Sequence, residues 1–124
     1  MNGLWVALGG ALGALCRYWL NNHVVIWLGR GFPYGILIVN VLGSFLIGLA
    51  FYWLVTKGLL NEWWRGMLIL GFLGALTTFS SFSLDTVQLI QEGAVTKALL
   101  YIVSSVGLCL FATFFGIWLA KALS

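Results

Sequence analysis

Apolar residues fall into four long runs, at positions 4–28, 33–55, 63–91 and 96–122, separated by short polar or glycine-containing breaks. A helix needs about 20 predominantly apolar residues to cross a bilayer, and each run is long enough. The pattern predicts an all-α membrane protein with four transmembrane helices. Because these spans use nearly the whole chain, we expect a single four-span transmembrane domain over residues 1–124.

Composition supports a membrane protein. The chain is 62% hydrophobic and 7% charged, whereas a soluble domain has about 25% charged residues. The N-terminus lacks the basic region of a signal peptide, so we expect the first span to be retained. The net charge of +3 is small and spread along the chain, and does not indicate nucleic-acid binding. Cys16 and Cys109 have no metal-ligand spacing, and we interpret them as small buried hydrophobic residues.

Basic residues are balanced between the two sides of the membrane. With four spans, the N-terminus, the connection between spans 2 and 3 and the C-terminus share one side. Three basic residues lie on each side: Lys57, Arg65 and Lys121 on this one, and Arg17, Arg30 and Lys97 on the other. A Lys/Arg bias normally sets orientation, and it is absent here. We therefore expect the chain to insert both ways up and to pair with an inverted copy.

The third apolar run contains the most unusual segment, TTFSSFS at positions 77–83, with five hydroxyl side chains in seven positions. Such side chains compete with the helix for backbone hydrogen bonds, and Gly71 and Gly74 precede them. Irregular backbone at membrane depth is tolerated only where it is buried in protein or lines a path for water or ions. We therefore predict a third helix broken in mid-membrane, with free carbonyls that can bind a cation and a helix N-terminus that can face an anion.

Two phenylalanines within this segment are candidates for contact with an anion. Phe79 and Phe82 share a face if the helix resumes, and packing is their ordinary role. However, ring edges carry partial positive charge, which can hold a dehydrated anion weakly enough for release. Ser81 and Ser83 can donate hydroxyl hydrogens to the same ion. Asp85 is either a solvated acid or an acceptor that organises these hydroxyl groups, and we favour the second.

Polar residues in the other spans admit two interpretations each. Asn40 lies on one face of span 2, either as an interhelical hydrogen-bonding group or as an amide that reaches an ion pathway. In span 4, Tyr101 and Ser105 share a face, which is either a packing surface or a polar track facing span 3. Arg17 lies deep in span 1, and it either snorkels to the interface or attracts an anion at a pore entrance. No nucleophile–base pair or metal cluster appears in the sequence, so we do not expect an enzyme.

Taken together, these residues resemble the Fluc/CrcB fluoride channels of bacteria. The motifs that carry the resemblance are GALCRY at 13–18, NxxGSFxxG at 40–48 and GFxGxxTTFSxFS at 71–83. The match covers the entire chain in order. It implies a passive, fluoride-selective channel that exports fluoride from the cytoplasm. It also implies an antiparallel, dual-topology homodimer with two pores in the bacterial cytoplasmic (inner) membrane.

The resemblance also implies roles for single positions. Phe79 and Phe82 would line the pore, and the Asn40 amide would contact fluoride. The backbone carbonyls of Gly74 and Thr77 would hold a structural Na⁺ at the dimer interface. The remaining implied positions lie at a vestibule or along the pore and its polar track: Arg17 at the vestibule, and Ser81, Ser83, Asp85, Tyr101 and Ser105 along the track.

The chain departs from the family pattern at two positions, and two other functions fit its four spans less well. Ile36 stands where the family often has Thr, so that hydroxyl group is absent here. Asp85 stands where the family usually has Glu, which keeps the charge but shortens the reach of the acid. The main alternative is a small, dual-topology, proton-coupled multidrug exporter, which needs a membrane-embedded carboxylate. Span 1 has none, and Asp85 lies beyond the expected break. A non-transporting assembly factor would leave the hydroxyl cluster unexplained.

Overall fold

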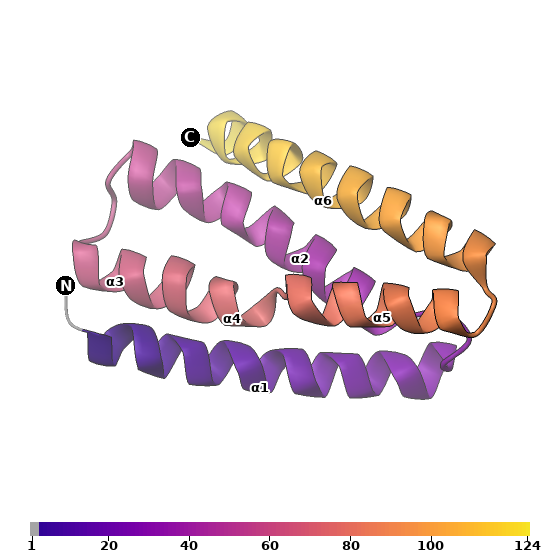
Figure 1. Cartoon of the computed structure of the whole chain (residues 1–124). Helices are drawn as coiled ribbons and strands as arrows, with labels where there is room; N and C mark the ends of the chain where they lie inside the picture. The colour runs from indigo at the N-terminus through magenta and orange to yellow at the C-terminus, as the bar shows by residue number, and fades with distance from the viewer. Residues whose placement is uncertain (1–2) are drawn as a thin grey trace.

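The computed structural model describes residues 3–124, and this part of the chain is helical, without strands. Its elements follow one another as α1 (Gly3–Leu28), α2 (Tyr34–Ala50), the π-helical η1 (Phe51–Thr56), α3 (Glu62–Arg65), the π-helical η2 (Gly66–Leu73), α4 (Gly74–Leu76), α5 (Phe79–Gln91) and α6 (Val95–Leu123) (Figure 1). Four segments are long and apolar enough to cross a membrane: Gly3–Leu28, Tyr34–Thr56, Glu62–Gln91 and Val95–Leu123. The prediction of an all-α chain with four membrane-spanning helices is confirmed.

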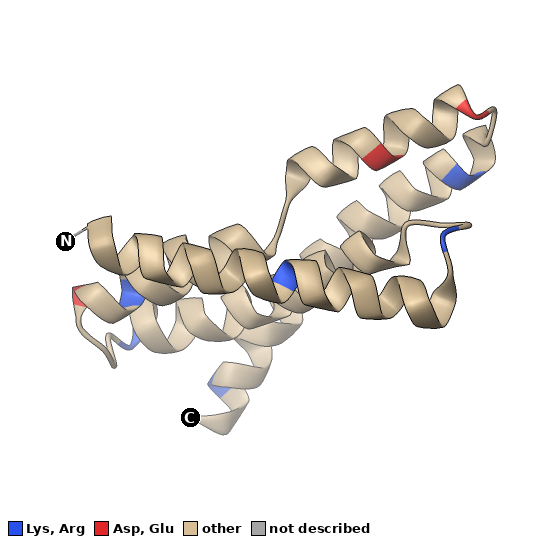
Figure 2. Cartoon of the chain, turned by 90° about the horizontal axis from the view of Figure 1, so that it is seen from below, with Lys and Arg blue, Asp and Glu red and all other residues tan. Residues whose placement is uncertain are grey.

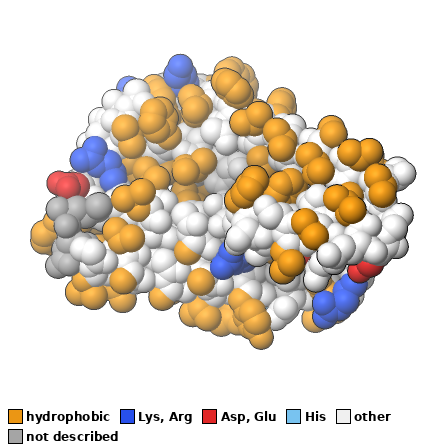
Figure 3. Space-filling view, viewed as in Figure 1, with side chains coloured by type: hydrophobic (Ala, Val, Ile, Leu, Met, Phe, Trp, Pro, Cys, Tyr) orange, Lys and Arg blue, Asp and Glu red, His pale blue; other side chains and the backbone are white. Residues whose placement is uncertain are grey.

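The helices run back and forth, so that the connections gather at two ends. The α1–α2 and α5–α6 connections lie at one end, and the start of α1, the η1–α3 connection and the end of α6 lie at the other (Figure 1). Most Lys, Arg, Asp and Glu residues lie near these ends (Figure 2), and hydrophobic side chains spread over the face between them (Figure 3). This is the surface expected of a helical bundle in lipid.

Side-chain hydrogen bonds tie the bundle together at both ends. At one end, Trp53 Nε1 donates to Ser124 Oγ at 3.2 Å, which joins η1 to the end of α6. At the other end, Lys97 Nζ donates to the Gly31 carbonyl oxygen at 3.1 Å, which joins α6 to the α1–α2 connection. These contacts fix the ends of α6 relative to the rest of the chain.

Glycines allow close contact between particular helix pairs. Gly9 and Gly13 of the GxxxG sequence face η2, and a Cβ at Gly13 would lie 2.1 Å from the Phe72 carbonyl oxygen. Between α2 and α6, a Cβ at Gly48 would lie 2.4 Å from the Thr113 carbonyl oxygen. The close approach expected at the GxxxG pair is confirmed, because only a residue without a side chain fits at these distances.

The third span changes its neighbours part-way along. Its first half, η2 and α4, packs mainly against α1, whereas α5 packs mainly against α6, and α5 turns away from α1 (Figure 2). Two hydrophobic clusters result, one on each side of the change. The first contains Val39, Leu73 and Leu76, and the second contains Leu89, Ala98 and Tyr101.

Candidate ion pathway

Two residues of extended backbone separate α4 from α5. Thr77 has φ −88° and ψ 155°, and Thr78 has φ −152° and ψ 122°. The Asn40 side chain bonds the backbone of Thr78 twice: the Thr78 N–H donates to Oδ1 at 2.8 Å, and Nδ2 donates to the Thr78 carbonyl at 3.1 Å. Thr78 Oγ1 in turn accepts the Ser81 N–H at 3.1 Å and caps α5. Side chains therefore provide hydrogen-bond partners for backbone groups that no longer have a partner within the helix.

Because of these hydrogen bonds, two backbone N–H groups do not donate to the carbonyl groups that would accept them in a continuous helix. In an uninterrupted helix, the Thr78 N–H would donate to the Gly74 carbonyl and the Ser81 N–H to the Thr77 carbonyl. Here the first N–H donates to Asn40 and the second to Thr78 Oγ1. The Gly74 and Thr77 carbonyl oxygens therefore lose their helical donors. Unwound carbonyls of this kind coordinate Na⁺ in membrane transporters, so the donor set fits the cation that the family resemblance implies.

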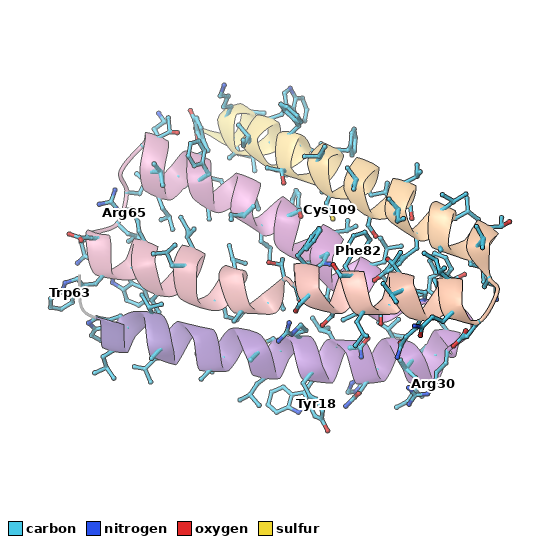
Figure 4. The ribbon with its side chains drawn as sticks, in the orientation of Figure 1. Tyr18, Arg30, Trp63, Arg65, Phe82 and Cys109 are labelled. Carbon is cyan, nitrogen blue, oxygen red and sulfur yellow. The ribbon has the colours of Figure 1, made fainter. Side chains whose placement is uncertain are left out.

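A cavity of about 410 Å³ lies beside the extended residues, between α2, the third span and α6. Figure 4 shows Phe82 and Cys109, two of its lining residues, near one another in the middle of the molecule. Six of the predicted site residues line this cavity: Asn40, Gly74, Thr77, Phe79, Phe82 and Ser105. The structure thus brings together residues from three of the four spans.

Aromatic rings form a row that begins at this cavity. The ring centroids of Phe79 and Phe82 are 5.4 Å apart, and those of Phe82 and Tyr101 are 5.1 Å apart. Phe79 is 77% exposed in the single chain, whereas Tyr101 is fully buried. Tyr101 donates its hydroxyl hydrogen to Asp85 Oδ2 at 3.1 Å, which joins α6 to α5.

Ser105 contributes a hydroxyl group without a partner. The residue is only 6% exposed, and its Oγ has no hydrogen-bond partner within residues 3–124. Burying an unpaired hydroxyl group costs about 1–3 kcal/mol. Ser105 is among the residues that line the cavity, which makes its hydroxyl group a candidate donor to a species bound there.

Other predicted residues lie outside this cavity. Ser81 and Ser83 are half-buried on α5 but do not line it, and Arg17 is half-buried midway along α1. Asp85 instead lines a second cavity of about 330 Å³, in the wedge between the end of α1 and α5, with Arg30 at its wall. Figure 4 shows Arg30 at that end of the molecule.

The geometry and the sequence motifs agree with comparisons to known proteins. The family described as "CrcB-like protein, Camphor Resistance (CrcB)" matches residues 4–117. The chain belongs to the CrcB family. It is 51% identical over 113 residues to a protein of Magnetococcus marinus named "Fluoride-specific ion channel FluC", an alignment that covers 91% of the chain and 92% of that relative. The resemblance inferred from the motifs is therefore confirmed.

Two further relatives bear the same name. A protein of Vibrio vulnificus is 50% identical over 118 residues, which cover 95% of the chain and 94% of the relative. A protein of Methylococcus capsulatus is 48% identical over 119 residues. The chain aligns over 96% of its own length in that case but spans only 52% of the relative, which is therefore a longer protein.

In this CrcB-family chain, Cys109 is a cavity residue that the sequence interpretation missed. The sequence predicts a small buried hydrophobic residue, but Cys109 is half-buried and lines the same cavity as Ser105. The expectation is wrong because the cavity leaves this side chain without neighbours on one side. The spacing could have indicated this position, because Cys109 follows Ser105 by four residues and both therefore lie on one helix face.

Proposed function

We propose that this chain is a passive, fluoride-selective channel that exports fluoride from the cytoplasm. The observation that carries the proposal is the cavity beside the break, where two phenylalanine rings and an unpaired hydroxyl group lie together without a cationic side chain in the lining. Removing a small anion from water costs on the order of tens of kcal/mol if nothing replaces its hydration. Ring edges, hydroxyl groups and an amide offset this cost without binding the anion too tightly to release it. The names of the relatives support fluoride as that anion.

The proposed pathway follows the row of rings and the polar side chains. Fluoride contacts Phe79, Phe82 and Asn40 beside the break, and Arg17 adds positive charge near a vestibule. We place the break at the bilayer midplane, because Thr77 and Thr78 lie at the middle of the 30-residue span Glu62–Gln91. The remaining pathway residues form the pore lining and its polar track: Ser81, Ser83, Asp85, Tyr101 and Ser105.

The functional unit in this proposal is an antiparallel homodimer with two pores in the bacterial cytoplasmic membrane. Phe79 and Gly74 are both exposed in the single chain, although both belong to the proposed ion sites. A second copy would cover them and complete the half-lined cavity, and closed two-fold pairing is the commonest form of oligomer. The balance of Lys and Arg between the two ends supports pairing with an inverted copy.

We also place a structural Na⁺ between the two copies, held by the carbonyl oxygens of Gly74 and Thr77 from each. The support is the loss of their helical donors and the exposure of Gly74. Such an ion would supply a fixed positive charge that raises the local potential for anions. The residues of this chain would provide the oxygen ligands and, through Asn40, the extended backbone that presents them.

Fluoride flux tests the proposed function directly. Purified protein reconstituted into liposomes is expected to release trapped fluoride, while protein-free liposomes retain it. Chloride serves as the control anion, and its release through the protein is expected to stay at the background of empty liposomes. Equal fluxes of fluoride and chloride would refute the selectivity.

Orientation of the C-terminus tests the inverted pairing. A tag after Ser124 is expected to be found on both sides of the same membrane, because the basic residues give no bias. Accessibility to an impermeant label in intact and opened cells measures this. Adding two lysines at the η1–α3 connection is expected to shift the population towards one orientation. A single orientation in the unaltered protein would refute dual topology.

A further inference from the structure

We propose that Asn40 is a positioning residue that holds the break open, and that it thereby couples the cation site to the anion pathway. This inference rests on the proposed function, since it assigns one side chain to both ion sites. It goes further because it gives Asn40 a second role, which is control of the backbone oxygen that would bind the cation.

The first support is the two-point contact between Asn40 and Thr78. The amide accepts the Thr78 N–H at 2.8 Å and donates to the Thr78 carbonyl at 3.1 Å, across 38 positions of sequence. A pair of hydrogen bonds to the two polar groups of one residue fixes its orientation as well as its position. Thr78 is thereby held in the extended conformation that separates α4 from α5.

The second support is competition for the Thr78 N–H. This group has two alternative acceptors, the Gly74 carbonyl of a continuous helix and Asn40 Oδ1, which accepts it here. As long as Asn40 accepts it, the Gly74 carbonyl is left for another partner. Without Asn40, either the helix closes and Gly74 loses its free oxygen, or the polar groups of Thr78 stay unpaired at membrane depth, which is costly.

The third support is the way α2 approaches the break. Gly43 lies three residues after Asn40 on the same helix, and a Cβ there would lie 2.2 Å from Thr77 Cγ2. The missing side chain lets α2 pack directly on the extended residues. This brings the Asn40 side chain within hydrogen-bonding distance of Thr78.

The fourth support is that one donor of the amide is left over. A side-chain amide has two N–H hydrogens, and within residues 3–124 the Asn40 amide donates one, to the Thr78 carbonyl. Asn40 lines the cavity with Phe79 and Phe82, so the second hydrogen is available to an anion there. In this proposal, the amide oxygen accepts the Thr78 N–H and so leaves the Gly74 carbonyl free for the cation, whereas the amide nitrogen can donate a hydrogen bond to the anion.

Two substitutions separate these roles. Asn40→Leu removes both hydrogen bonds, whereas Asn40→Asp keeps an oxygen for the Thr78 N–H and loses the donor. Thermal stability is measured against Na⁺ concentration, with a large organic cation replacing Na⁺, and fluoride flux is measured in liposomes. Asn40→Leu is expected to raise the Na⁺ concentration for half-maximal stabilisation at least tenfold and to reduce flux. Asn40→Asp is expected to keep the Na⁺ dependence while losing flux.

Two controls show whether any effect is specific. Phe79→Ile is expected to reduce flux with an unchanged Na⁺ dependence, because it leaves the Thr78 contacts intact. Asn22→Leu removes an exposed amide from α1 and is expected to change neither measurement. If Asn40→Leu loses flux but keeps the Na⁺ dependence of the unaltered protein, Asn40 is only an anion ligand and the inference is overturned.

Hydrogen exchange separates failure of this inference from failure of the proposed cation site. If the stability of the unaltered protein does not depend on Na⁺, the cation site and the coupling are both refuted. The effect of Asn40 on the conformation of Thr78 is then measured by the rate of backbone amide hydrogen exchange over residues 74–82. Faster exchange in Asn40→Leu than in the two controls supports the positioning role, and unchanged exchange overturns it.

Discussion

Replacing Phe79 or Phe82 by isoleucine is expected to reduce fluoride flux sharply. Isoleucine keeps the apolar bulk but has no ring edge, so the dehydrated anion loses a partner with partial positive charge. A hydrogen-bond-like contact with a charged group is worth about 1.5–3 kcal/mol. Because about 1.4 kcal/mol changes a rate tenfold, the expected reduction is about 10- to 100-fold for each variant in a liposome efflux assay.

The matched control is Phe114→Ile. Phe114 is 74% exposed on α6, close to the 77% of Phe79 in the single chain, but it does not line the cavity. The substitution has the same chemistry at an exposed position outside the cavity, so flux is expected to stay near that of the unaltered protein. If all three variants conduct equally well, the rings do not face the ion and the pathway assigned here is wrong.

Gly13→Ala is expected to destabilise the protein by forcing α1 away from η2. The new Cβ would lie 2.1 Å from the Phe72 carbonyl oxygen, which is backbone and cannot move aside as a side chain can. Overpacking costs typically about 1–3 kcal/mol, and we expect the upper part of this range. A lower midpoint of thermal or chemical unfolding measures the effect.

Gly107→Ala provides the comparison for this change. Gly107 lies within α6, and a Cβ there would meet no atom within 4 Å apart from its chain neighbours and the nearby backbone of its own helix. Alanine favours helix over glycine by about 1 kcal/mol, so this variant is expected to be as stable as the unaltered chain or slightly more stable. Similar losses at both positions would show that the contact between α1 and η2 is not tight in the native protein.

The four spans could be predicted from the sequence because the apolar runs are long and clearly bounded. The choice of helix neighbours could not. Gly9 and Gly13 indicate that α1 approaches some helix closely, but not that its partner is the first half of the third span. The change of partner at Thr77 and Thr78 depends on packing between residues far apart in sequence. The π-helical turns of η1 and η2 leave no pattern that we could recognise.

The candidate site was partly predictable for the same reason. The hydroxyl cluster located the extended residues, and the spacing of Tyr101 and Ser105 placed them on one face. The sequence could not distinguish a structural role for Asn40 from a role in an ion pathway, because its hydrogen-bonding partner, Thr78, lies 38 positions away in the sequence. Ser81 lies on a different face of α5 from Phe79 and does not line the cavity. Ser83 follows Phe79 by four residues, but it also lies outside the cavity lining.

The change of neighbours at Thr77 and Thr78 makes the third span a joint between two arms. One arm is η2 with α4, which pack on α1, and the other is α5, which packs on α6. Membranes differ in thickness, and helices tilt to match them. We expect any bending between the arms to occur at Thr77 and Thr78, which already lie outside the helical hydrogen-bond pattern. Because Gly74, Thr77 and Phe79 flank this joint, we expect the thickness of the surrounding bilayer to affect the spacing of the atoms in the proposed ion sites.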